Sequence, residues 1–146
     1  MESTHYAAGG RVGYDRAGYQ FHQPPSRRER GHRLQFIPDI SYIDARTWSS
    51  LSAADKRKAY RPCVPVVVIE LMSETDNIED SQAKVTRFIH AGCREGVIVD
   101  TRRDRVWIYN RDQQLYFTAL APIEFDWWPE FTLDCIAIRD ARLRAE

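Results

Sequence analysis

Glu70 is the residue whose sequence surroundings most strongly suggest chemistry. It stands near the end of an apolar run, residues 64–72 (VPVVVIELM). An ionised carboxylate in such a run is costly unless it is paired or bound to a metal ion. Strand alternation places Glu70 on the face of Val66 and Val68, so its side chain is expected to point inward. A structural pairing with an arginine is the alternative that the sequence leaves open.

A second carboxylate, Asp39, follows Pro38 within an alternating apolar segment, residues 34–43 (LQFIPDISYI). Pro-Asp is common in turns, and that interpretation stays open. If the strands that carry Asp39 and Glu70 are neighbours, the two carboxylates converge and repel each other unless a cation lies between them. Mg²⁺ fits such a position because it takes hard oxygen ligands, usually one or two carboxylates with waters and a phosphate.

Lys84 is the third candidate, in a segment whose pattern predicts a helix over residues 76–91. Ile78, Val85 and Phe88 fall on one apolar stripe, and Lys84 lies just off it. It can be an ordinary surface lysine whose aliphatic stem lies along apolar surface. It can also reach a metal site and hold the attacking water or the phosphate.

The segments around these residues predict an α/β chain in which strands and helices alternate. The β-branched run at residues 64–72 is typical of a strand covered on both faces. Residues 44–62 are expected to form a short helix or two turns, with Ser52 as an N-cap. Thr75 or Asp76 can cap the helix over residues 76–91, and Gly92 is well placed to end it.

The second half of the chain predicts a meander that ends in an aromatic group. Residues 97–99 and 106–109 alternate around a turn, and residues 115–120 are expected to form the next strand. The aromatic residues within 124–134 more often close a core than bind a ligand.

Composition indicates one folded domain. The chain has 146 residues, of which 43% are hydrophobic, and its 21 basic and 21 acidic side chains balance. This balance argues against a protein that coats nucleic acid indiscriminately, but it allows a local basic surface. The spacing of the three cysteines favours reduced thiols over a disulfide framework or a structural zinc site. No signal-peptide core or membrane-spanning stretch is visible, so we expect a cytoplasmic protein that does not contact membranes.

Taken in order, these features resemble the Uma-type restriction endonuclease family of the PD-(D/E)XK nuclease superfamily. The matching pieces are Pro38-Asp39, Glu70-Leu71-Met72-Ser73, Gln82-Ala83-Lys84, Gly92, Val99-Asp100, residues 106–109, and Pro129-Glu130-Phe131-Thr132-Leu133-Asp134. Each piece is short, and the specificity comes from the ordered set.

The resemblance implies a restriction-endonuclease-like fold, with a central mixed sheet flanked by helices and a DNA endonuclease site at its centre. Asp39, Glu70 and the backbone carbonyl of Leu71 would hold Mg²⁺, with Mn²⁺ as a substitute. Lys84 would lower the pKa of the attacking water. The superfamily places a lysine two residues after the acid, but Met72 stands there, and in this family the next helix supplies the lysine.

The resemblance further implies supporting residues and partners. Ser73, Gln82 and Asp100 would support the site without reacting themselves. The expected partners are DNA and a second copy of the chain. Four arginines could contact the DNA backbone, although each is more simply explained as part of a solvated face: Arg87, Arg94, Arg102 and Arg103.

The expected division of the chain is an irregular arm over residues 1–33, a nuclease-like core over 34–138 and a tail over 139–146. Family members carry more sequence before the Pro-Asp strand, so an N-terminally truncated member is expected. A degenerate nuclease fold that binds nucleic acid or a protein without catalysis is therefore the alternative function.

Overall fold

The computed structural model describes residues 10–14, 17–22, 33–111 and 116–145. Its strands are β1 (Arg11–Tyr14), β2 (Gly18–His22), β3 (Arg33–Phe36), β4 (Ile40–Ile43), β5 (Tyr60–Arg61), β6 (Val67–Leu71), β7 (Glu95–Asp100), β8 (Arg105–Asn110), β9 (Tyr116–Ala119), β10 (Ile123–Phe125) and β11 (Trp128–Leu133). Its helices are α1 (Ala45–Ser50), α2 (Ala53–Lys56), α3 (Ile78–Ala91) and α4 (Cys135–Ala145). None of these helices is both long and apolar enough to cross a membrane.

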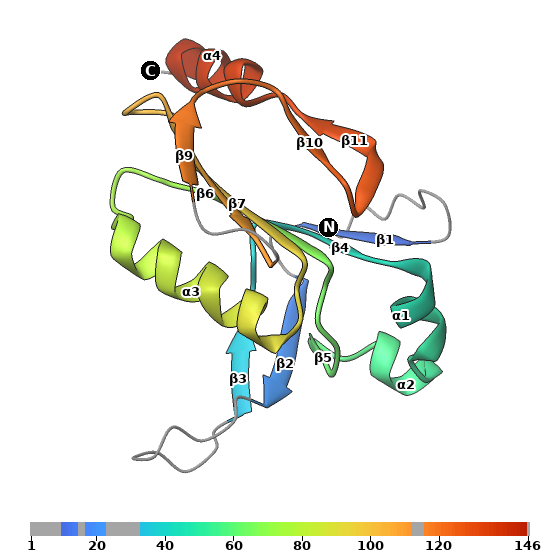
Figure 1. Ribbon diagram of the computed structural model, residues 1–146. Coiled ribbons are helices and arrows are strands. Elements are labelled where there is room, and N and C mark those ends of the chain that lie inside the picture. Colours follow the sequence, from blue (N-terminus) through green and yellow to red (C-terminus); the bar gives the residue numbers. More distant parts are fainter. Residues whose placement is uncertain (1–9, 15–16, 23–32, 112–115, 146) are drawn as a thin grey trace.

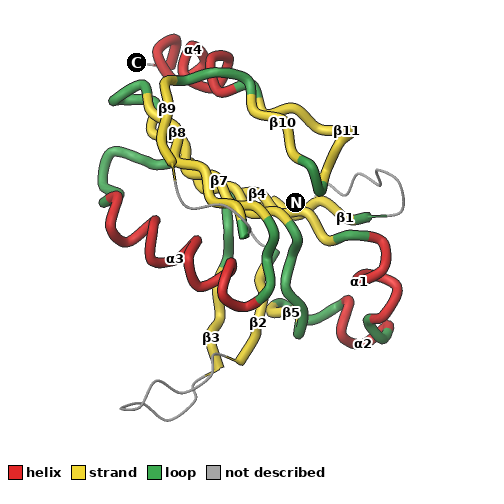
Figure 2. Tube along the Cα trace, in the orientation of Figure 1, coloured by secondary structure: helices red, strands yellow, loops and turns green. Residues whose placement is uncertain are grey.

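A six-stranded sheet forms the centre of the molecule, in the order β1-β4-β6-β7-β8-β9. β6 and β7 are parallel, because α3 connects them as a crossover, and the other neighbours are antiparallel. The sheet is therefore mixed and flanked by helices, which confirms the fold class expected from the sequence (Figures 1 and 2).

Each face of this sheet is covered by a different layer. Figure 1 shows α3 on one face and the β10–β11 hairpin with α4 on the other. Val85 and Phe88 of α3 are fully buried in one core cluster with Val68 of β6. Trp128 of β11 lies in the second cluster, stacked on Tyr42 of β4 with ring centres 4.7 Å apart. The central strands are covered on both sides, as their continuous apolar sequence predicted.

A smaller three-stranded sheet, in the order β3-β2-β5, packs aromatic residues against α3. The Phe88 ring lies 6.1 Å from Tyr19, 5.3 Å from Phe21 and 5.7 Å from Phe36, measured between ring centres. This cluster fixes the position of α3, and with it the position of Lys84.

The irregular arm expected over residues 1–33 needs correction where the structure describes it. Residues 11–14 form β1, a terminal strand of the large sheet, and residues 18–22 form β2, the middle strand of the small sheet. Tyr19 and Phe21 are core residues. These strands are only four and five residues long. An alternating apolar pattern in so short a segment cannot be recognised without knowing the partner strands. Residues 1–9, 15–16 and 23–32 of the expected arm lie outside the described residues.

Residues 34–43, expected to form one interrupted strand, belong to two strands in different sheets. β3 ends at Phe36 and β4 begins at Ile40, with buried Pro38 between them. Proline has no N–H to donate to a ladder, so the chain leaves the small sheet here and enters the large one. This break directs Asp39 toward β6.

The two predicted helical regions form, with one change of cap. The Ser52 side chain accepts a hydrogen bond from the Asp55 N–H at 3.0 Å, which confirms the expected N-cap of α2. α3 is capped by Asn77 rather than by Thr75 or Asp76, so it begins later than predicted. Gly92 ends α3 with a φ of 125°, a conformation that favours glycine.

The meander and the C-terminal region also follow the sequence pattern. β7 and β8 pair as the predicted hairpin, and β9 pairs with β8 over the described part of the third strand, since Leu115 lies outside the described residues. α4 begins at Cys135, so the boundary expected after residue 138 falls inside a helix. The three cysteines are free thiols, as expected.

Candidate functional site

Asp39 and Glu70 meet at one end of two neighbouring strands. β4 pairs with β6 in an antiparallel register that places Ile40 opposite Ile69. Asp39 precedes β4 and Glu70 follows Ile69, so the antiparallel register brings the two carboxylates to the same end of the sheet. The negative charge of Asp39 acts on Glu70 and contributes to the raised pKa of that residue.

The Asp39 carboxylate is held by the backbone of β6. Its Oδ2 accepts a hydrogen bond from the Leu71 N–H at 2.6 Å. The next residue, Met72, donates its N–H to the Val99 carbonyl on the other side, at 3.0 Å. Because the N–H and C=O of one strand residue point the same way, the Leu71 carbonyl is directed to the side of Asp39.

Lys84, which lies on α3, is the third residue of the site. Its ammonium nitrogen lies 2.9 Å from Glu70 Oε1 and donates a hydrogen bond to the Ile37 carbonyl at 2.8 Å. The Lys84 side chain is 27% exposed, whereas the Glu70 side chain is 10% exposed. The lysine therefore reaches from the solvent-facing side of the helix to a buried carboxylate, and the segment before Asp39 holds its end in place.

Burial dominates the electrostatics of Glu70. Removal from water raises its pKa from 4.5 to about 7, the Lys84 charge opposes this rise, and Asp39 adds to it. Oε1 is buried, and the Lys84 ammonium that pairs with it lies 2.9 Å away. The site thus holds a buried carboxylate, paired with a lysine, beside a second carboxylate.

These donors suit a hard divalent cation. Among the described residues there is no group of three or more His, Cys, Asp or Glu side chains that could hold a metal ion. A cation at this point would therefore be held by the Asp39 and Glu70 carboxylates, the Leu71 carbonyl and waters. That set matches Mg²⁺, which keeps several waters and takes one or two carboxylates. The meeting of two carboxylates at one end of the sheet, one of them buried, is the structural feature that supports this fit.

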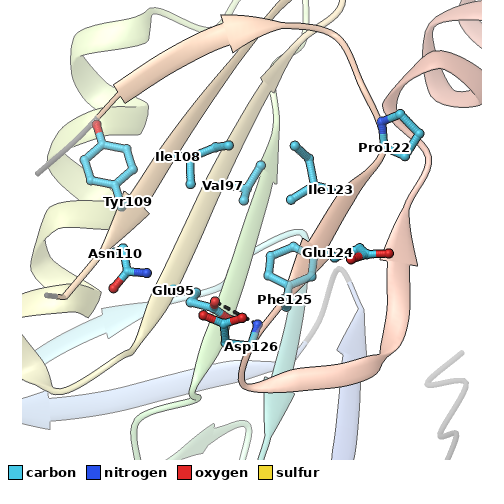
Figure 3. A pocket seen from close by; sticks show the side chains of 10 residues that line it. All are labelled: Glu95, Val97, Ile108, Tyr109, Asn110, Pro122, Ile123, Glu124, Phe125 and Asp126. Atoms are coloured by element: carbon cyan, nitrogen blue, oxygen red, sulfur yellow. Dashed lines mark hydrogen bonds between the residues drawn. The ribbon is translucent and has the colours of Figure 1, made fainter. Parts of the chain in front are cut away.

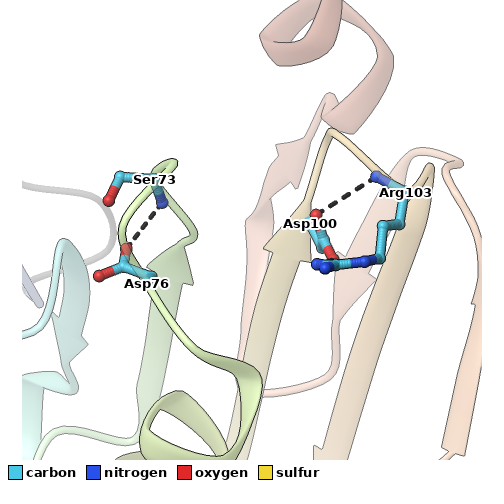
Figure 4. A network of polar contacts seen from close by, with 4 residues as sticks. All are labelled: Ser73, Asp76, Asp100 and Arg103. Carbon is cyan, nitrogen blue, oxygen red and sulfur yellow. Dashed lines mark hydrogen bonds and ion pairs between the residues drawn. The ribbon is translucent and has the colours of Figure 1, made fainter.

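Ser73 and Asp100 act on loops next to the site rather than on its carboxylates. The Ser73 N–H donates to Asp76 Oδ2 at 2.7 Å, in the loop that leads into α3. Asp100 is buried and accepts bonds from the Arg103 N–H at 3.3 Å and its guanidinium at 3.2 Å. Figure 4 shows one pair after β6 and the other after β7. Both pairs order the loops at the end of the sheet that carries Glu70.

Gln82, the remaining supporting candidate, faces a different neighbour. It and Thr86 approach the Tyr109 hydroxyl, where they partly offset a burial that raises the pKa of Tyr109 to about 12. Gln82 therefore lies near Tyr109 of β8.

The four arginines expected at the DNA backbone do not lie together. Arg102 and Arg103 lie in the turn after β7, close to the site, and they are paired with Glu74 and Asp100. Arg87 stacks over Phe36, 5.8 Å from the ring centre. Arg94 precedes β7, at the end of that strand away from Glu70, and stacks over Trp127.

A cavity of about 350 Å³ lies on the opposite face of the sheet, between β7, β8 and the β10–β11 hairpin (Figure 3). Sequence reasoning did not single out its buried acid, Glu95. The Glu95 carboxylate accepts hydrogen bonds from the Asp126 and Trp127 N–H groups at 3.0 and 3.2 Å. It anchors the hairpin turn, and nothing in the apolar pattern of β7 distinguishes this role.

Comparisons with known proteins bear on the family and the fold of the chain. The model of the Uma2 family, described as "Putative restriction endonuclease", matches residues 9–130. No curated protein matches the sequence. A crystal structure of a "putative nuclease" from Anabaena variabilis ATCC 29413 superposes with a TM-score of 0.70. The match covers 91% of this chain and 69% of that one at 15% identity, so this likeness establishes the fold alone.

Proposed function

Because the chain belongs to the Uma2 family of restriction-endonuclease-like proteins, we propose that it is an endodeoxyribonuclease that hydrolyses phosphodiester bonds with a divalent metal ion, Mg²⁺ or Mn²⁺. The observation that carries this proposal is the convergence of Asp39, Glu70 and Lys84. The Glu70 carboxylate contacts the Lys84 ammonium at 2.9 Å, and Asp39 is fixed to the strand that carries Glu70.

The chain's own residues would bind the cation, orient the attacking water and move protons. Asp39 and Glu70 would hold the cation together with the Leu71 carbonyl. A bound divalent ion supplies Lewis-acid stabilisation of the negative charge that develops on the phosphate. Ionisation of Glu70 is required for this role, and the Lys84 charge favours that ionised form.

Lys84 would orient the attacking water. Its ammonium is anchored by the Ile37 carbonyl at 2.8 Å, so it is already placed when substrate arrives. An ammonium beside the attacking oxygen stabilises hydroxide relative to water and lowers the pKa of that water. A neutral, isosteric side chain at residue 84 would keep the fold of α3 but lose this effect.

A second copy of the chain is part of the proposal, since β9 is a terminal strand of the large sheet and its Phe117 is 61% exposed. Terminal strands offer unpaired backbone groups to another chain. Sedimentation of the protein over a range of concentrations tests this point, and a monomer at every concentration would contradict it.

Cleavage of supercoiled plasmid with Mg²⁺, Mn²⁺ or EDTA tests the activity. We expect metal-dependent nicking that falls by about 10²-fold or more in Glu70→Gln and in Lys84→Met. Glu130→Gln, which changes an exposed carboxylate of β11, is the matched control and should nick as the wild type does. Nicking that persists unchanged in Glu70→Gln would contradict the assigned site.

A nuclease fold that binds nucleic acid without cutting it is the second candidate function. The observation that favours it is that no third acidic or His ligand joins the two carboxylates among the described residues. The two functions differ in metal linkage: a metal site raises the melting temperature in Mg²⁺ or Mn²⁺, and a vestigial site does not.

A further inference from the structure

Two aromatic residues lie in line with Glu70 across the large sheet. In the ladder between β6 and β7, Glu70 stands opposite Ile98. Ile98 in turn stands opposite Trp107 of β8, and Trp107 stands opposite Phe117 of β9. Residues that are directly opposite on neighbouring strands point to the same face of a sheet. This is the face that α3 covers, because Ile98 and Trp107 pack in the core cluster that contains Phe88.

This line brings the aromatic residues within reach of a DNA strand that is cut at Glu70. Neighbouring strands of a sheet lie about 4.8 Å apart. Trp107 is two strands from Glu70 and therefore about 10 Å away, and Phe117 is three strands and about 14 Å away. One strand of nucleic acid advances about 3.4 Å for each nucleotide, so these distances correspond to about three or four nucleotides.

The rings of Trp107 and Phe117 form one aromatic surface, which we call the Trp107–Phe117 platform. Their centres are 5.3 Å apart, and their planes are inclined by 39°. Trp107 is half-buried against the core, so it gives the platform a fixed base. Phe117 is 61% exposed, the largest exposed fraction of any large hydrophobic residue that the structure describes. An exposed aromatic face is the feature on which unpaired bases stack.

A pocket of about 400 Å³ adjoins the platform, and its chemistry suits a base rather than a phosphate. Trp107 lines this pocket together with Arg103, Arg105 and the residues at the start of α3. The arginines are matched by acids: Asp100 pairs with Arg103 at 3.2 Å, and residues 76–79 contribute two further carboxylates. A lining with this balance does not favour an anion. It offers donors and acceptors side by side, as the edge of a nucleobase does.

We propose that the Trp107–Phe117 platform stacks an unpaired base of the DNA substrate, about three or four nucleotides from the phosphodiester bond at Glu70. This inference rests on the proposed function and names its substrate class, DNA with a single-stranded segment near the cleaved bond. A base inside a duplex is already stacked on both faces, so only an unpaired base is free to bind here. Pairing of β9 with a second copy would use the backbone edge of the strand, whereas Phe117 stands on the face of the sheet.

The test compares the binding of two fluorescent DNAs in EDTA, measured by anisotropy. Each DNA has a duplex of about 20 base pairs and an overhang of about six nucleotides, and both overhang polarities are measured. One overhang carries thymine bases and the other only abasic sugars, so the phosphates are identical. We expect the wild type to bind the DNA with bases about tenfold more tightly, the size expected for one stacked base.

Variants of Phe117 separate stacking from packing. Phe117→Ala and Phe117→Leu should both abolish the preference for bases, although leucine keeps the apolar bulk, and Phe117→Tyr should retain it. The matched control is Leu143→Ala, which removes another exposed apolar side chain, on α4 at the other face of the sheet, and should bind as the wild type does. Equal binding of the two DNAs by the wild type, or a full preference in Phe117→Ala, would overturn the platform.

Two further readouts separate the platform from the rest of the proposal. Metal-dependent nicking by a wild type with no preference for bases would overturn the platform and leave the nuclease standing. A preference that depends on Phe117, in a protein that never nicks DNA, would sink the proposed function and support the platform. A change in the sedimentation of Phe117→Ala without a change in base preference would assign Phe117 to the contact between copies and overturn the platform.

Discussion

Replacement of Glu70 by glutamine should make the protein increasingly stable relative to the wild type as the pH rises. Burial raises the pKa of Glu70 from 4.5 to about 7. Between these values the unfolded chain releases the Glu70 proton while the folded chain keeps it. The free energy of unfolding of the wild type therefore falls as pH rises through this window, and the loss is complete above about pH 7. The glutamine side chain of the variant has no proton to release, so the variant escapes this loss.

The magnitude follows from the two pKa values. Their difference of 2.5, at about 1.36 kcal/mol for each pKa unit, gives about 3 kcal/mol. The Glu70 side chain is 10% exposed, so solvent screens little of this cost. Loss of the Lys84 contact also changes the absolute stability of Glu70→Gln. The pH dependence, rather than the absolute stability, isolates the buried charge.

Urea unfolding of both proteins at pH 4.5 and at about pH 8, in EDTA, measures the effect. We expect the stability difference between Glu70→Gln and wild type to increase by about 3 kcal/mol over this range. Glu130→Gln, which removes an exposed carboxylate, is the matched control and is measured at both pH values. Equal differences at both pH values for Glu70→Gln, with unchanged m values, would refute the reasoning that Glu70 is buried at a cost.

Three further predictions concern the same architecture. Asp39→Asn should abolish the stabilisation by Mg²⁺, which in the wild type is expected to be about 2.7 kcal/mol when Mg²⁺ is 100 times its Kd and to raise the melting temperature. A rise in melting temperature that persists in the variant would remove Asp39 from the metal site. Phe88→Ala should cost about 3–5 kcal/mol in urea unfolding because the ring is fully buried, and a cost below about 1 kcal/mol would contradict the aromatic core. Gly96→Ala would place a methyl group 2.4 Å from Val85 Cγ1, so it should push α3 off the sheet, lower stability by about 1–3 kcal/mol and slow nicking by displacing Lys84, whereas nicking at the wild-type rate would separate helix position from catalysis.

Local sequence patterns were sufficient where one element determines the outcome. The β-branched run predicted a buried strand that carries an inward-facing Glu70, and Glu70 is 8% exposed in β6. The amphipathic pattern predicted α3, and its end at Gly92 follows from a backbone conformation that glycine adopts readily. The start of α3 was less well determined, because several adjacent residues can cap a helix and only the loop geometry selected Asn77.

Long-range pairing decided what sequence patterns could not. Residues 11–14 and 18–22 became strands because partner strands bury their apolar sides, and their own short patterns carried too little signal. The arginines were a similar case. Nothing local distinguishes Arg94, which stacks on Trp127, from Arg103, which pairs with Asp100.

The sequence by itself indicated the residues that we propose carry the chemistry: a buried acid, a second acid after a proline, and a lysine beside an apolar helical stripe. Only the tertiary structure decided that β4 lies next to β6, so that Asp39 reaches the Leu71 N–H. It also brought Lys84 to the Ile37 carbonyl and placed Phe117 in line with Glu70. The physical reason is that periodicity reports how deeply a residue is buried and on which face, whereas its neighbours depend on strand order and packing across the whole chain.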